Sequence, residues 1–537
     1  MSCIWGNNNV TAKINHKKSE WGINYYGGYR SFKNYWRENS ETFNFENDPS
    51  FTRVEEGIPD KVKMHWDNLT MSYSYQEEEK WFINVALRGN FRGNKQNTQS
   101  TLYPISNPAN SVEMKDYTGS NSKSPSLDIY LQRNLKHNQA IILNTVGTYI
   151  HTYDDRTYEE KKHSDIVTDI YSAIRGKKYS FIGEGIYEKR FTNSKFSTGI
   201  RHQQSLTENR YAGTSSAETQ MQEAYTSTYV EYSCKVKKFN YSLGLQGSRS
   251  WFNQEGEGYQ QYSFLPRLRL TYNFSDHAFI RYQGDISRST PALSDLNNVE
   301  QLIDSLQIRR GNPTLKMSTV YNNTLNFDYR KGLFSGSLYL LYQYQRKPNM
   351  EETIRENDLF IRTIANQRSW QKLNPEIEVK VGPFKDILSL SVTTGINYFD
   401  SRGHNYHHTY TNWYYRASIM ASYKNWSSFF EIQNHRNDFY GETLRYGENY
   451  HILGINYRYK QLTAGIMGLN LFSDNYKVGS ENFNSSAPSK NWMYIKESSR
   501  MIAVSIAWNF SFGRKYESAE KRLHNEDNNA GTLKSGK

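Results

Sequence analysis

The last strand-like run of the chain, residues 502–512, alternates between apolar and polar side chains with almost no exception. Successive side chains of a strand point to opposite faces, so alternation over about ten residues fits a strand with lipid on one face and water on the other. Strands of soluble sandwiches are usually about half as long. The predicted lipid-facing side chains of this last strand are Ile502, Val504, Ile506, Trp508, Phe510 and Phe512.

The same alternation recurs along the chain, for example in residues 69–75, 81–88, 267–274, 388–397 and 412–419. Several of these runs place Arg on the face that otherwise carries Ser, Thr and Asn. A guanidinium group on that face belongs in a wet lumen, because it would be costly against lipid. The sequence therefore predicts an all-β fold, a large antiparallel transmembrane β-barrel of about 21–22 strands spanning residues 1–513.

The connections between these runs are alternately short and long. Short turns are expected near residues 16–20, 76–80, 134–138, 192–195, 275–278, 330–333, 382–386 and 424–426. Long polar segments separate them, at residues 93–123, 206–221, 289–316, 347–362 and 474–497. Short periplasmic turns and long extracellular loops are typical of barrels in the outer membrane of Gram-negative bacteria, which is the predicted location.

The number of strands is informative because a closed antiparallel barrel made from one bacterial chain needs an even number. The first strand, near residues 10–16, precedes a short turn, and the last one follows a long loop. Both would run toward the periplasm, so a count of about 21 leaves one upward strand missing. The sequence thus predicts a barrel that has lost its beginning. Residues 153–191, interpreted as a loop and one long strand, would change the parity if they formed two strands.

The two ends of the chain carry few structural signals. Met1 is followed by no basic region and apolar core, so no secretory signal is expected at this start. Residues 514–537 are charged and lack periodicity, which predicts a disordered periplasmic tail. Cys3 and Cys234, the two cysteines, form no disulfide framework.

Composition agrees with a barrel and restricts other functions. Aromatic residues make up 15% of the chain although its mean hydropathy is −0.84, a combination that aromatic girdles and a polar lumen explain. The sequence contains no run of about 18 apolar residues, so no transmembrane helix is predicted. The net charge of +12 comes from Lys and Arg spread among Asp and Glu. We therefore expect contact with anionic outer-membrane lipid and no nucleic-acid partner.

A segment in the middle of the chain resembles TonB-dependent receptors, and more narrowly their outer membrane protein beta-barrel branch. The motif is Arg310, Gly311, Asn312, Pro313, Leu315 and Lys316, preceded by Pro291-Ala-Leu-Ser-Asp-Leu. In that branch the motif ends a long extracellular loop and launches the next strand, here expected from Thr324. Met317 and Ser318 stand where the branch often has Pro-Glu. The terminal run from Ile506 to Lys515 is similar to the same branch.

The resemblance implies nutrient import through a barrel of 22 strands that an N-terminal plug domain fills. It also implies a TonB complex that supplies energy through a short N-terminal box, and insertion by the barrel-assembly machinery. The plug and the box are expected to be absent from this sequence, so the TonB complex would act only through the missing N-terminal part. The ligand is an unknown small nutrient, since the loops would suit a glycan, a peptide or a metal chelate.

Candidates for chemistry are few. His404, His407 and His408 form the best metal candidate, but they lack a Cys or carboxylate partner at a fixed spacing, so a solvated loop is favoured and no metal or cofactor is expected. No nucleophile has a convincing His and carboxylate arrangement, so no catalytic residue and no enzyme are predicted. An inactive truncated receptor, a passive pore and an adhesin-like surface barrel remain open as alternatives to a transporter.

Overall fold

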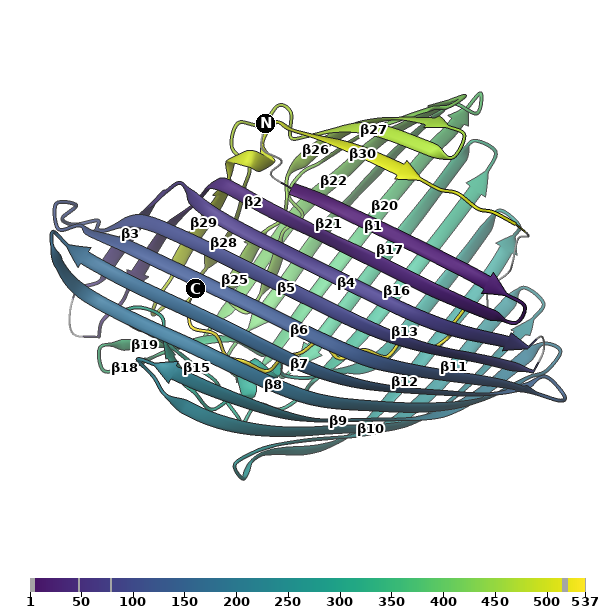
Figure 1. Ribbon diagram of the computed structural model, residues 1–537, viewed down its shortest axis with the longest axis horizontal. Coiled ribbons are helices and arrows are strands. Elements are labelled where there is room, and N and C mark those ends of the chain that lie inside the picture. The colour runs from purple at the N-terminus through teal and green to yellow at the C-terminus, as the bar shows by residue number, and fades with distance from the viewer. Residues whose placement is uncertain (1–4, 47–48, 78–79, 514–519, 537) are drawn as a thin grey trace.

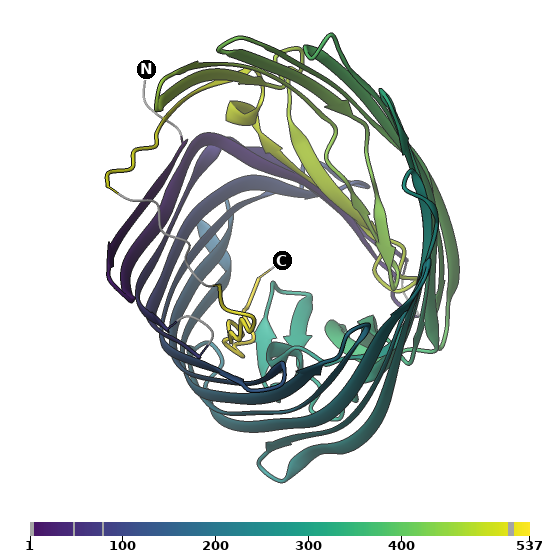
Figure 2. The ribbon, with the colours of Figure 1, turned by 90° about the vertical axis from the view of Figure 1, so that its right-hand side faces the viewer.

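Hydrogen bonding between neighbouring strands builds one long antiparallel wall in the computed structural model, which describes residues 5–46, 49–77, 80–513 and 520–536. The wall curves around a central space (Figures 1 and 2). No helix in the described part of the chain is long and apolar enough to cross a membrane.

Twenty-one strands make the wall, and each pairs antiparallel with the next in this order. They are β1 (Trp5–His16), β2 (Ser19–Phe43), β4 (Asp60–Glu77), β5 (Trp81–Pro104), β6 (Val112–Leu135), β7 (Gln139–Lys162), β8 (Asp165–Arg190), β9 (Ser194–Gly213), β10 (Ala217–Val236), β11 (Phe239–Gln254), β12 (Glu257–Ser275), β13 (Ala278–Ser289), β16 (Ser318–Lys331), β17 (Phe334–Arg346), β20 (Ser369–Phe384), β21 (Leu388–Arg402), β22 (His407–Tyr423), β23 (Trp426–Gln433), β26 (Tyr450–Tyr459), β27 (Leu462–Leu469) and β30 (Met501–Trp508). The predicted fold class is confirmed.

Short turns join the wall strands at the end that we assign to the periplasm, as predicted. Lys17, Lys424 and Lys460 take left-handed backbone conformations in three of them, with φ of 54°, 54° and 52°. Such conformations suit two-residue hairpins, because their twist matches that of the flanking strands. The predicted turn at 76–80 lies partly outside the described residues.

At the other end the connections contain more strand than the sequence predicts. β5 and β6 pair as far as Leu102 and Val112, so most of residues 93–123 is hairpin and not loop. β9 and β10 likewise leave only residues 214–216 between them. β7 and β8 form one long hairpin that turns at residues 163–164, which keeps the predicted parity across 153–191. Further short strands extend the wall here: β3 (Phe51–Ile58), β24 (Asp438–Tyr440), β25 (Thr443–Tyr446), β28 (Lys477–Asn482) and β29 (Ser489–Ile495).

The two edges of the wall, β1 and β30, run in the same direction because the number of wall strands is odd. Within the described residues, β1 is registered with β2 alone and β30 with β27 alone. The edges are bridged at their extracellular end, where β2 pairs with β29 through seven residue pairs. Glu497 Oε1 also accepts hydrogen bonds from the backbone N–H groups of Lys33 and Asn34 at 2.7 and 2.9 Å. We call this junction the seam.

The outer face of β30 follows the predicted alternation. Ile502, Val504 and Ile506 are 70%, 72% and 75% exposed, as side chains on the outside of a barrel should be. Trp508 ends the strand, and Phe510 and Phe512 lie just beyond it. Contact of these six side chains with lipid stays a prediction.

Reversal of polarity at position 506 tests the embedding of this strand. Ile506→Arg should cost about 2–4 kcal/mol of folding free energy near the bilayer midplane, because a charge would then face lipid. Ser505→Arg, the matched control one residue away, should cost little because its side chain faces the lumen. Urea unfolding in lipid vesicles measures both, and equal tolerance of the two variants would contradict an embedded β30.

Candidate functional site in the barrel lumen

Two connections between wall strands turn into the barrel and pair with each other there. The first contains α1 (Leu293–Leu296), β14 (Glu300–Leu302) and β15 (Gln307–Arg310), and the second is the hairpin of β18 (Asn349–Glu356) and β19 (Leu359–Asn366). β15 pairs antiparallel with β14 and parallel with β19, which gives a four-stranded inner sheet. Figure 2 shows this sheet inside the ring of wall strands.

The predicted family motif forms the hinge between the inner sheet and the wall. Arg310 ends β15 and donates to Glu300 Oε1 at 2.6 Å and to both carboxylate oxygens of Glu356 at 2.6 and 2.8 Å. The two hydrogen bonds from Arg310 to Glu356 lower the pKa of the Glu356 carboxyl. Gly311 packs against the backbone of Asn297, where a Cβ atom would lie 1.9 Å from the carbonyl oxygen. Only glycine fits there.

The second half of the motif fixes the chain before β16. Asn312 Nδ2 donates to the Ile364 carbonyl at 3.0 Å, and its Oδ1 accepts from the Thr314 N–H at 3.0 Å. The Lys316 N–H donates to Asn366 Oδ1 at 2.9 Å. The motif precedes a strand, but this strand, β16, starts at Ser318 and not at the expected Thr324. The motif also lies within the barrel and not in an outer loop.

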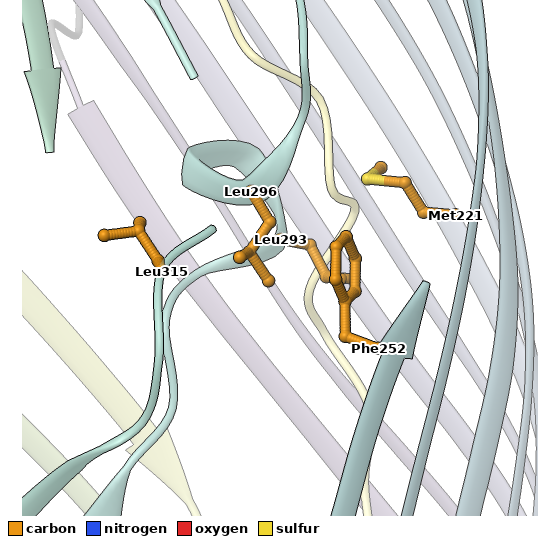
Figure 3. Packing of buried hydrophobic residues seen from close by; sticks show 5 residues of the cluster. All are labelled: Met221, Phe252, Leu293, Leu296 and Leu315. Atoms are coloured by element: carbon orange, nitrogen blue, oxygen red, sulfur yellow. The ribbon is translucent and has the colours of Figure 1, made fainter. Parts of the chain in front are cut away.

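A small apolar cluster attaches this connection to the inner wall. Leu293 and Leu296 of α1 and Leu315 of the motif pack with Met221 and Phe252, which project from β10 and β11 (Figure 3). All five side chains are 1–2% exposed. Burial of this size stabilises the inserted position, because each large apolar side chain contributes about 1.5–3 kcal/mol when fully buried.

Buried charges make a second attachment. Arg53 of β3 lies 2.9 Å from Glu41 Oε2 and 2.6 Å from Asp304 Oδ2, and it is 8% exposed. Arg156 of β7 binds both carboxylate oxygens of Asp116 at 2.8 and 3.0 Å and donates to the Ile303 carbonyl at 2.8 Å. Each buried guanidinium therefore has carboxylate partners, and the wall holds the segment around residues 303–304 from two sides.

The C-terminal tail, residues 520–536, lies in the lumen along the inner face of β5–β10 (Figure 2). This corrects the predicted disordered periplasmic tail; residues 514–519 and 537 lie outside the described part. Leu523 packs against Phe82, Tyr130 and Ile142. Asn525 Nδ2 donates to Asn144 Oδ1 and Glu184 Oε2, both at 2.9 Å. The tail is held by specific contacts.

Charges of the tail also pair with charges of the wall. Lys521 lies 2.6 Å from Asp128, and Lys534 lies 2.6 Å from Asp154. Asp527 lies 2.9 Å from Lys178, whose side chain is 1% exposed. Sequence periodicity could not reveal these contacts, because each joins residues several hundred positions apart.

A cavity of about 630 Å³ opens near the extracellular end of the lumen. It lies where the tips of β3, β5 and β7 approach the segment around Leu306. Aromatic and charged side chains both line it, and the lining residues include Phe45, Phe51, Arg53, Glu160, Leu306 and Asp358. A concave site of this size with a few polar groups among apolar ones suits a small ligand.

The histidine candidates do not converge. His404 Nε2 lies 3.0 Å from the Asn366 carbonyl, His407 Nε2 lies 3.4 Å from Asp400, and His408 Nε2 lies 3.3 Å from Glu442. His407 and His408 are successive residues of β22, so their side chains point to opposite faces. Among the described residues, no three metal-ligating side chains gather at one point.

Known proteins resemble this chain in sequence pattern and in fold. A family model described as "Outer membrane protein beta-barrel family" matches residues 151–508. The copper transporter OprC has a similar structure with a TM-score of 0.61 and 10% identity, covering 94% of this chain and 80% of that one. The FrpB iron transporter from Neisseria meningitidis gives a TM-score of 0.56 and 10% identity, covering 92% and 82%.

A variant of the ferric enterobactin receptor PfeA from Pseudomonas aeruginosa gives a TM-score of 0.54 and 12% identity, covering 94% of this chain and 80% of that one. At such identities the likeness is one of fold. No curated protein matches the chain.

The buried ion pairs of Arg53 allow a test of whether the inserted loops are attached to the wall. Arg53→Met should destabilise the protein by about 3–5 kcal/mol, because Glu41 and Asp304 would stay buried without their cation. The matched control, Arg210→Met, breaks an ion pair with Glu218 whose two side chains are 74% and 75% exposed, and should change little. Chemical unfolding in vesicles compares them, and an equal effect of both would contradict a buried attachment.

Proposed function

Since this chain belongs to the outer membrane protein beta-barrel family and lies in the outer membrane of a Gram-negative bacterium, we propose that it forms the conduit of a TonB-dependent transporter that takes up a small nutrient. The observation that carries this proposal is the cavity at the extracellular end of a lumen that the inserted segments partly occupy. A ligand would bind from outside and could pass only when these segments move.

The chemistry of the cavity supports a compact ligand with both apolar and polar groups. Phe45 and Phe51 supply aromatic surface, and the charged side chains of Arg53, Glu160 and Asp358 also line the site. The similar structures are those of an iron transporter, a copper transporter and a ferric enterobactin receptor. We therefore place metal chelates first among the candidate nutrients, with the TonB complex as energy source and the barrel-assembly machinery as the route of insertion.

A permanently open pore fits the lumen less well. The tail occupies the inner face of β5–β10, and the inner sheet fills space beside it (Figure 2). Water and ions would have to pass between these segments and the remaining wall. A gated conduit agrees better with this arrangement than a passive channel does.

Nutrient depletion tests the proposed uptake while the identity of the ligand is still open. Cells that produce the protein should remove at least one small molecule from the medium faster than cells that lack it, and a protonophore should abolish the difference. Mass spectrometry of the medium measures this. No chain-dependent depletion, or depletion that survives the protonophore, would contradict TonB-driven uptake.

The cavity predicts which variant weakens that uptake. Phe51→Ala should reduce depletion about fivefold or more at low nutrient concentration, because it removes an aromatic contact surface from the site. Phe264→Ala is the matched control, since Phe264 is 65% exposed and lies outside this cavity. Equal depletion by the two variants would contradict binding at this cavity.

Single-channel recording tests whether the tail obstructs the lumen. The chain ended after Gly513 should conduct ions several times better in planar bilayers than the complete sequence, because Lys521, Leu523 and Asn525 would no longer cover the inner wall. A full-length variant with Lys521→Gln, Arg522→Gln, Asp527→Asn and Lys534→Gln keeps the tail but removes its ion pairs with the wall. Its conductance should alternate between the low level of the complete sequence and the high level of the shortened chain. Identical conductance of all three proteins would contradict an obstructing tail.

A further inference from the structure

The outer face of the wall is hollowed across β5–β8. A cavity of about 1020 Å³ lies there, and most of its lining side chains point away from the lumen. Its floor is formed by residues with little or no side chain: Gly89, Pro125 and Gly147. A Cβ atom built on Gly147 would meet no atom within 4 Å. The register of β6 with β7 is interrupted between Lys123 and Ser126, beside Pro125.

Apolar side chains surround this hollow. Leu87, Leu127, Tyr179 and Phe181 are 59%, 42%, 51% and 51% exposed, and the rings of Tyr149 and Tyr179 lie 5.1 Å apart. Exposed apolar surface is expected on a barrel wall. A hollow in it is a place where one hydrocarbon chain can be held on several sides.

Three basic side chains border the extracellular end of the hollow. Lys123, His151 and Lys177 occupy one row across neighbouring strands, because Lys123 is registered with His151 and His151 with Lys177. Phe91 continues the row on β5 and Glu208 on β9. Lys123 and Lys177 are exposed, and neither takes part in an ion pair among the described residues. On the next row outward, Arg175 lies over the ring of Tyr153 at 5.8 Å.

The height of this row matches the head-group level of the outer leaflet. Lys123, His151 and Lys177 lie about twelve residues from the periplasmic ends of β6, β7 and β8. A strand rising about 3.3 Å per residue and tilted by about 40° covers roughly 30 Å over that length. The apolar hollow lies just below, at the depth of acyl chains.

We propose that this hollow is a binding site for a phosphorylated glycolipid of the outer leaflet. One acyl chain lies over Gly89 and Gly147, and a phosphate group is held by Lys123, His151 and Lys177. Lys and phosphate are favourable partners at a membrane surface, where each basic residue contributes measurably to the binding of anionic lipid. Glu208, at the β9 end of the row, repels a phosphate group. The phosphate therefore lies over β6–β8.

Titration of the purified protein with bis-phosphorylated lipid A, followed by native mass spectrometry, tests the site. The variant Lys123→Gln/Lys177→Gln should bind at least about tenfold more weakly, since two cations near the surface are lost. The matched control Lys235→Gln/Lys237→Gln removes two exposed lysines at a periplasmic turn and should bind like wild type. Equal loss in both double variants would overturn the proposal.

A second variant tests the hollow apart from the charges. Gly147→Leu fills the floor of the hollow, where the added atoms meet open space, and should weaken lipid A binding while the protein stays folded. Lipid A without phosphates should bind to wild type as weakly as lipid A binds to the lysine variant. Undiminished binding by Gly147→Leu, by dephosphorylated lipid A or by phosphatidylglycerol would each overturn the assignment of a phosphorylated glycolipid.

Discussion

Backbone pairing in the absence of water is the constraint on which the rest of this structure depends. A strand that crosses hydrocarbon must satisfy its N–H and C=O groups on neighbouring strands, since an unsatisfied group costs several kcal/mol. The wall meets this demand from β2 to β27, and each strand there is registered on both sides. At β1 and β30 the ladder stops, because two strands that run in the same direction cannot continue it antiparallel. The pairing of β2 with β29 joins the edges only at the extracellular end.

The interior follows from the wall. Inward side chains include Asp128, Lys178 and Arg156, and such groups need partners once they leave water. The tail supplies Lys521 for Asp128 and Asp527 for Lys178, and the segment before β15 supplies a carbonyl group for Arg156. Segments with little apolar surface of their own thus become ordered, because the wall offers charges that match theirs. The lumen is a set of paired charges around a few apolar anchors such as Leu315 and Leu523.

Sequence patterns predict the wall and fail in the interior for physical reasons. Alternation identifies β30, and the short turns identify the periplasmic end, because both signals are local. Residues 93–123 form a hairpin that the sequence presents as loop, since strands above the membrane need no lipid face. The pairing of β15 with β19 joins segments about fifty residues apart, and the contact of Lys178 with Asp527 joins segments 349 residues apart. His407 and His408 are close in sequence, yet the strand separates their side chains.

Crosslinking between the two edge strands, β1 and β30, tests this account most directly. In a background with Cys3 and Cys234 replaced by serine, a short thiol crosslinker should join Trp5→Cys to Met501→Cys, because the Trp5 side chain donates a hydrogen bond to Met501. The same reagent should not join Asn15→Cys to Ala507→Cys at the periplasmic end, where β1 and β30 are not registered with each other. Efficient crosslinking of both pairs would mean that the edges are closed along their length and would contradict the account.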